Sequence, residues 1–198
     1  MSAQISKLRT TIYAVFFLFA IGVVAYQLYQ RYKLQHPALP EFGTVPTFTL
    51  TTEDHRTFSH EDFKGKVTIT DFIFTTCAGP CPIMSGQMQQ LQATLQKTSI
   101  QFVSFSVDPE TDTPEVLTEY ANRFGAIKGQ WIFLTGAKQI IYEAIRSGFH
   151  LAIEDDENAI AHSTKFVLVD KEGQIRGYYD IEDDDSMKKL VEDAKSLL

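Results

Sequence analysis

The fold is decided by residues 67–82, which read VTITDFIFTTCAGPCP. The first part, from Val67 to Phe74, is mostly β-branched or aromatic, a composition typical of a strand. That strand leads directly into Cys77 and Cys81, and Pro82 suits the first turn of a helix. The stretch therefore predicts a strand-to-helix junction that carries two thiols.

The elements around this junction predict an α/β domain with a thioredoxin-like fold. A helix follows, with Met84, Met88, Leu91 and Leu95 at helical spacing. Further predicted elements are a strand at 101–107, a helix at 114–124, a strand at 131–134, a helix at 138–146, strands at 165–169 and 174–179, and a last helix to residue 196. Residues 48–51 and 56–58 predict a leading β-hairpin. The order βαβαβ followed by ββα is typical of a thioredoxin-like sheet.

Cys77 and Cys81 are the only cysteines, so no disulfide framework holds the fold together. A helix N-terminus favours anions, and we therefore expect at least one of the two thiols to ionise more readily than a free cysteine. Gly79 and the two prolines make a poor core element, which argues against a pair of packed small hydrophobes. Thiol–disulfide exchange, metal binding, or both remain open.

The spacing of the cysteines and the histidines narrows these alternatives. Three residues separate the thiols instead of the two that are common in thioredoxins, which weakens a simple oxidoreductase interpretation. Two thiolates are too few for a zinc site or an iron–sulfur cluster, whereas soft Cu(I) suits thiolates completed by one imidazole. Of His36, His55, His60, His150 and His162, the last opens a predicted hairpin, whose loop we expect to face the cysteines.

Two further kinds of residue near the thiols have a structural and a functional interpretation. Asp71 shares a strand face with Ile69 and Ile73, where a hydrogen-bonded structural aspartate is the simpler interpretation and a proton acceptor for the thiols the alternative. Met84 and Met88 offer soft sulfur, but their helical spacing favours core packing.

The N-terminal segment predicts a membrane anchor. Residues 10–30 contain no charge and lie between Arg9 and Arg31, a length that spans a bilayer and exceeds the apolar region of a cleaved signal peptide. We expect residues 1–33 to form an uncleaved anchor with one transmembrane helix at about 10–30, residues 34–45 a linker, and residues 46–198 the domain. The basic residues slightly favour a cytoplasmic N-terminus, which puts the domain on the extracytoplasmic face.

The charge distribution argues against nucleic acid as a partner. The chain has a net charge of −7, but Met1–Lys33 holds four basic residues and no acid, so the remainder carries −11. Such a body repels phosphate backbones. Residues 154–157 and 182–185 concentrate the acid, and we interpret them as a solvated loop and a helix start, with docking to a basic partner as the alternative.

Five ordered motifs resemble the Sco (SenC) family: residues 72–82, 106–115, 131–136, 162–164 and 168–170. The resemblance covers about residues 46–179. It implies a thioredoxin-like fold, a copper ion bound through Cys77, Cys81 and His162, and a role in assembling the dinuclear copper site of cytochrome c oxidase. Many members have proline directly after the first cysteine, where this chain has Ala78. Cys77, Cys81 and His162 still match the copper-binding positions of the family that the sequence resembles.

These observations support two main functional hypotheses. The first is a copper metallochaperone whose partners are the copper-bearing subunit of cytochrome c oxidase and a thiol reductant or another copper chaperone. The alternative is a membrane-anchored thiol–disulfide oxidoreductase in which Cys77 attacks, Cys81 resolves, and the cysteines of the copper acceptor are reduced. A copper or redox sensor is a third, weaker hypothesis. A metal role requires His162, whereas an exchange role does not.

Overall fold

The computed structural model of the chain describes residues 13, 16–28, 30–31, 39–151 and 163–198. The chain divides into two compact units, Met1–Ala38 and Leu39–Leu198. In the first unit, residues 16–28 are helical. Within the described part of the chain, no helix is long and apolar enough to cross a membrane. The expected span at 10–30 includes positions 10–12, 14–15 and 29, which lie outside the described residues.

The second unit is built on one seven-stranded sheet with the order β2-β1-β5-β4-β3-β6-β7. Its strands are β1 (Thr49–Thr52), β2 (Thr57–Ser59), β3 (Thr68–Ile73), β4 (Gln101–Ser106), β5 (Trp131–Thr135), β6 (Lys165–Val169) and β7 (Ile175–Asp180). Strands β3, β4 and β5 are parallel, and β1 and β6 run antiparallel to their neighbours β5 and β3. The carboxyl ends of the parallel strands therefore share one edge with the start of β6.

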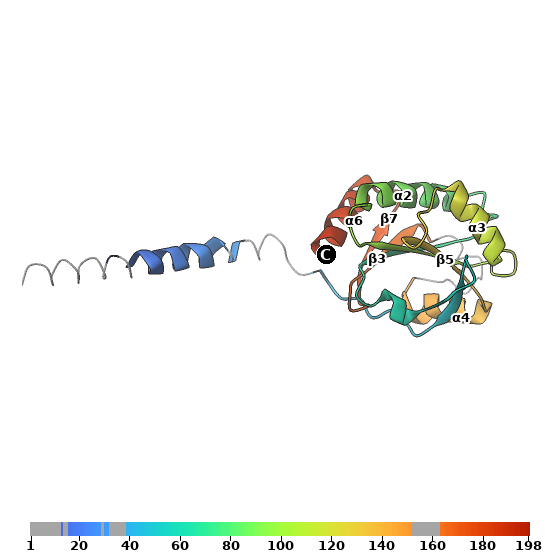
Figure 1. Cartoon of the computed structure of the whole chain (residues 1–198), viewed down its shortest axis with the longest axis horizontal. Coiled ribbons are helices and arrows are strands. Elements are labelled where there is room, and N and C mark those ends of the chain that lie inside the picture. The colour runs from blue at the N-terminus through green and yellow to red at the C-terminus, as the bar shows by residue number, and fades with distance from the viewer. Residues whose placement is uncertain (1–12, 14–15, 29, 32–38, 152–162) are drawn as a thin grey trace, which may run out of the picture. The chain divides into compact units, whose positions relative to one another are not determined.

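Helices cover both faces of this sheet (Figure 1). One face carries α2 (Pro80–Leu95), α3 (Pro114–Arg123) and α6 (Asp184–Ser196). The other face carries α4 (Lys138–Glu143), which continues as the π-helix η2 (Ala144–Gly148). A short 3-10 helix, η1 (His60–Phe63), follows β2. The helices on each face pack against the sheet over a separate apolar cluster. Burial of these side chains is the main favourable contribution to folding.

The expected order of elements is confirmed, including the antiparallel leading hairpin of β1 and β2. Met84 and Met88 are fully buried in the cluster beneath α2, so their prediction as core residues is confirmed. The acidic run at 182–185 begins α6, with Asp183 as its N-cap. The other acidic run, at 154–157, lies outside the described residues.

Two boundaries differ from expectation, each for a local reason. Helix α2 begins at Pro80, two residues before the proline expected in its first turn, because proline also suits the first helical position, and Cys81 therefore lies inside the first turn. The helix predicted at 138–146 widens into a π-helix at Ala144. There Gly148 lies against Pro46, whose ring would be 2.1 Å from any Cβ at position 148, so only glycine allows this contact.

Residues 39–45 pack onto β7 and the turn before it. The Phe42 amide donates to the Ile175 carbonyl at 2.9 Å, and the Ile175 amide donates to Gly43 at 2.7 Å. The half-buried Arg176 side chain donates to the carbonyls of Leu39 and Pro40 and pairs with the Asp170 carboxylate at 2.8 Å. These bonds fix the point at which the chain enters the domain.

Candidate dithiol and metal site

The two cysteines occupy different environments at the end of β3. Cys77 lies in the turn between β3 and α2 and is half-buried, whereas Cys81 in the first turn of α2 is 1% exposed. Both are free thiols. The Cys77 amide donates to the Phe74 carbonyl at 3.2 Å, and the Cys77 sulfur accepts a hydrogen bond from the Gly79 amide at 3.4 Å. The turn therefore presents one sulfur outward and keeps the other inside.

Burial raises the pKa of the Cys81 thiol to about 12, and interactions with Cys77 and with the Asp71 carboxylate add to the rise. The helix N-terminus offers little compensation, since Pro80 and Pro82 have no N–H group and two donors of the first turn are missing. Cys81 is therefore not the easily ionised thiol that the sequence predicts for at least one member of the pair. This sulfur stays protonated at neutral pH unless another group changes its surroundings.

Asp71 lies on the same face of β3 as Ile69 and Ile73, the face that α2 covers, and is fully buried. Neither of its carboxylate oxygens meets the geometry of a hydrogen bond among the described residues, which favours the alternative of a proton acceptor over a hydrogen-bonded structural aspartate. Burial raises its pKa to about 7, with the nearby Ser104 hydroxyl opposing the rise in part. A carboxyl group in this state can hold or release a proton at neutral pH.

Tyr120 completes the buried polar groups below the thiols. Its hydroxyl shares a hydrogen bond of 2.9 Å with the Ser85 hydroxyl, one turn along α2 from Cys81. Burial raises its pKa to about 12, and the charges of Asp71 and Cys81 contribute in the same direction. The pKa values of Cys81, Asp71 and Tyr120 are thus all raised, which favours the neutral form of each group.

Asp112 supports the cysteine turn from the neighbouring loop, and sequence reasoning assigned it no role. Its fully buried carboxylate accepts hydrogen bonds from the Thr75 amide at 3.1 Å, the Thr75 hydroxyl at 2.5 Å and the Ser106 hydroxyl at 2.6 Å. Burial raises its pKa, and these donors oppose the rise. The order of the strands could have predicted this contact, because the loops that follow adjacent parallel strands meet at one edge of the sheet.

The third predicted ligand, His162, lies outside the described residues. Because β6 runs antiparallel to β3, the described chain enters β6 at the sheet end where β3 leaves for Cys77. Within residues 39–151 and 163–198, no group of three or more His, Cys, Asp and Glu side chains is placed to hold a metal ion. His55 and His60 instead pair with Glu115 and Glu61, each at 3.0 Å.

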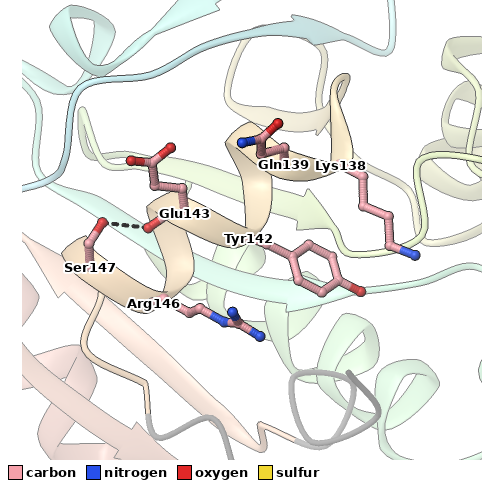
Figure 2. A pocket seen from close by; sticks show the side chains of 6 residues that line it. All are labelled: Lys138, Gln139, Tyr142, Glu143, Arg146 and Ser147. Carbon is pink, nitrogen blue, oxygen red and sulfur yellow. Dashed lines mark hydrogen bonds between the residues drawn. The ribbon is translucent and has the colours of Figure 1, made fainter. Parts of the chain in front are cut away.

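A separate hollow of about 630 Å³ lies along α4 and η2, on the opposite face of the sheet from α2 (Figures 1 and 2). Figure 2 shows its lining side chains, which include Lys138, Tyr142 and Arg146. The Lys138 ammonium lies 5.6 Å from the centre of the Tyr142 ring. With neither a thiol nor an imidazole in its lining, this hollow does not belong to the dithiol chemistry.

The helix-covered sheet with a dithiol after its inner strand β3 places the chain in the class of thioredoxin-fold dithiol proteins. The SCO1/SenC family model matches residues 38–198, and the chain belongs to this family. The expected Sco resemblance is thereby confirmed.

Three similar proteins support this membership. The SCO1 protein homolog of Bacillus subtilis is 34% identical over 157 residues, covering 77% of this chain and 81% of the relative. The structure of BsSco, titled a member of the Sco family of cytochrome c oxidase assembly proteins with a disulfide switch, has a TM-score of 0.72 at 30% identity and covers 82% of this chain and 98% of its own. The structure of yeast Sco1 with copper bound has a TM-score of 0.62 at 26% identity, and the match covers 80% of this chain and 96% of the yeast chain.

Proposed function

We propose that this chain is a copper metallochaperone that holds a copper ion through Cys77, Cys81 and His162 and passes it to the copper-bearing subunit of cytochrome c oxidase. The observation that carries the proposal is the half-exposed and buried thiol pair at the end of β3. The Sco relatives add support, since one is solved with copper bound and another is named for oxidase assembly.

A copper cation at the site would change the ionisation of the buried acids. The pKa values of Cys81, Asp71 and Tyr120 are all raised, because burial makes negative charge costly there. A copper ion beside the sulfurs would reverse this effect and deprotonate a coordinating thiol. Metal binding should therefore release protons, and the apparent affinity should rise with pH.

The sheet topology supports His162 as the third ligand. The residues after position 162 lead into β6, which begins at the sheet end next to the cysteine turn. Two thiolates and one imidazole give a soft three-coordinate site that suits Cu(I).

Copper stoichiometry and affinity, measured on the soluble fragment from residue 34 onward, test this ligand set. Wild type should bind one copper ion, and His162→Ala should bind it much more weakly in competition with a Cu(I) chelator. The absorption spectrum of the Cu(II) form should also change. His55→Asn is a matched control, because this exposed histidine pairs with Glu115 and asparagine tolerates its positive φ of 62°. Equal copper affinity of wild type and His162→Ala would remove His162 from the site.

Cys77 is partly exposed to solvent and Cys81 is buried, and this difference supports a second candidate function, thiol–disulfide exchange. In this reaction the Cys77 thiolate attacks a disulfide of the copper acceptor and forms a mixed disulfide. Cys81 then loses its proton and attacks the Cys77 sulfur, which releases the acceptor's second thiolate. Two electrons pass to the acceptor, and a Cys77–Cys81 disulfide remains for a thiol reductant to reduce. Asp71 is the buried acid on this face that can take the Cys81 proton.

Ligand variants separate the two candidates. His162→Ala should keep most of its ability to reduce a disulfide, while Cys77→Ser and Cys81→Ser should each lose both copper binding and exchange. In cells limited for copper, His162→Ala should lower oxidase activity, and added copper should restore part of it by mass action on the weakened site. Full oxidase assembly by His162→Ala under copper limitation would leave the oxidoreductase as the function.

We further propose that residues 10–30 anchor the protein with a single span and that the domain faces the extracytoplasmic side. The support is the uncharged 21-residue segment, whose described positions 16–28 are helical with exposed apolar side chains. A dithiol on that side depends on a reducing partner, because the compartment is oxidising.

A further inference from the structure

A long uncharged stretch surrounds the dithiol. Between Asp71 and Lys97 the sequence holds 25 residues without Asp, Glu, Lys, Arg or His, although 22% of the chain is charged. The stretch covers the cysteine turn and all of α2. The exposed residues next to the thiols, which we call the dithiol rim, are Thr76, Ala78, Gly79, Pro82 and Ile83. The rim therefore offers a partner apolar and neutral surface only.

Ile83 makes this surface unusual for a helix exposed to water. Its side chain is 60% exposed, the most exposed large hydrophobic side chain among the described residues of the domain. Elsewhere α2 buries its large apolar residues, and its exposed positions are Gln89, Gln90, Ala93 and Thr94. A single exposed isoleucine is common on protein surfaces, but this one lies in the same uncharged turn as a thiol.

Transfer chemistry requires such contact. A sulfur of the acceptor must come within about 2 Å of the Cys77 sulfur to form a disulfide, or share a metal at about 2.3 Å from each sulfur. At that distance the acceptor surface covers the residues that flank Cys77 and the next turn of α2. These are the residues of the rim.

We propose that the dithiol rim is the docking surface for the copper acceptor, and that it fits a folded protein whose own cysteines lie in an apolar, uncharged surface. This inference rests on the proposed function, because it takes the acceptor to be a protein that exchanges copper or electrons with Cys77. Removing apolar area at Ile83 should weaken docking while leaving the thiols intact.

The test compares wild type, Ile83→Gln and Ile127→Gln, each as the full-length chain in detergent. Glutamine matches the exposed residues of α2 and adds no charge near the thiols. Ile127 is a matched control: it is 46% exposed, and its amide donates a hydrogen bond to Gln92 Oε1 at 2.9 Å near the far end of α2. Gln92 lies eleven residues beyond Cys81, or about 16 Å along the helix axis.

Transfer is measured to two acceptors, a low-molecular-weight disulfide and the copper-free soluble domain of the oxidase subunit. Ile83→Gln should react like wild type with the small disulfide and bind the same amount of copper. It should need about tenfold more of the protein acceptor for half-maximal transfer, and Ile127→Gln should behave as wild type. Equal transfer by Ile83→Gln and wild type, or equal losses in both variants, would overturn the rim proposal alone. Failure of wild type to transfer copper or electrons to the oxidase domain would overturn the proposed function and, with it, the rim as that acceptor's surface.

Discussion

At the residue scale, the dithiol site is defined by acids that folding keeps from ionising. Asp71 is the clearest case, since it is fully buried without a hydrogen-bond partner among the described residues. A native protein that retains such a group accepts a cost in stability at the pH where the group ionises. The cost is consistent with a role in the reaction of the neighbouring thiols, for which a proton must be held and released.

Asp71→Asn should alter the pH dependence of stability in the reduced, copper-free domain. The pKa of Asp71 is raised from 3.8 to about 7, so the native state binds the proton more tightly than the unfolded state. The free energy of unfolding of wild type should therefore fall as the pH rises from about 4 to about 7, and level off once Asp71 is ionised in both states. Asparagine cannot ionise, and the variant should gain up to about 4 kcal/mol relative to wild type over this range.

Urea unfolding of both proteins at about pH 4.5 and about pH 7.5 measures this difference. The two stability curves should converge at the acid end and separate with increasing pH. Parallel curves would show that Asp71 is not the group that ionises.

At the scale of elements, the cysteine turn depends on the loop after β4. Asp112 is the only residue in that loop whose side chain bonds both to Thr75 and to Ser106 among the described contacts. This brace joins the ends of two parallel strands and fixes the residue two positions before Cys77.

Asp112→Asn should loosen the turn, because the amide puts a donor group where both carboxylate oxygens accept hydrogen bonds. We expect a loss of about 1–3 kcal/mol in the free energy of unfolding, the cost of unsatisfied buried partners. Copper should also be lost faster to a chelator. Asp108→Asn in the same loop is the control and should change both quantities little. Wild-type copper retention in Asp112→Asn would show that the brace serves the fold and not the site.

The sequence predicts the elements well because their signals are local. The β-branched run before Cys77, the helical spacing from Met84 to Leu95 and the acidic start of α6 each depend on near neighbours. What the sequence does not reveal depends on packing between distant segments. The missing hydrogen-bond partners of Asp71, the rise in the pKa of Cys81 and the brace at Asp112 all arise where β3, β4 and α2 meet, whereas the burial of Asp71 follows from its place on a strand face with Ile69 and Ile73.

At the scale of the whole molecule, the chain combines a basic, apolar N-terminal segment with an acidic domain. The anchor proposed at residues 10–30 should keep the protein in the membrane fraction after alkaline or high-salt washing, because a spanning helix is held by burial and not by charge. Immunoblotting of the washed membranes measures this. A shortened soluble form that begins near residue 26 would show instead that the segment is a cleaved signal.

The orientation of the whole protein is tested by a reporter fused after Leu198. A cysteine-free reporter that works only outside the cytoplasm should be active, because the basic residues before the span slightly favour a cytoplasmic N-terminus. Activity of a cytoplasm-specific reporter at the same position would contradict both the topology and the proposed delivery of copper to the oxidase.

The pairing of residues 42–45 with the start of β7 also determines where the protein can be shortened. Phe42, Gly43 and Val45 occupy the backbone hydrogen-bonding groups of Gly173 and Ile175 at the outer edge of the sheet. A truncated protein that begins at Pro46 would leave these groups unpaired on an edge strand, which is a template for association with other chains. Truncation at Pro46 should therefore promote aggregation, whereas a protein that begins at or before Leu39 keeps this edge covered.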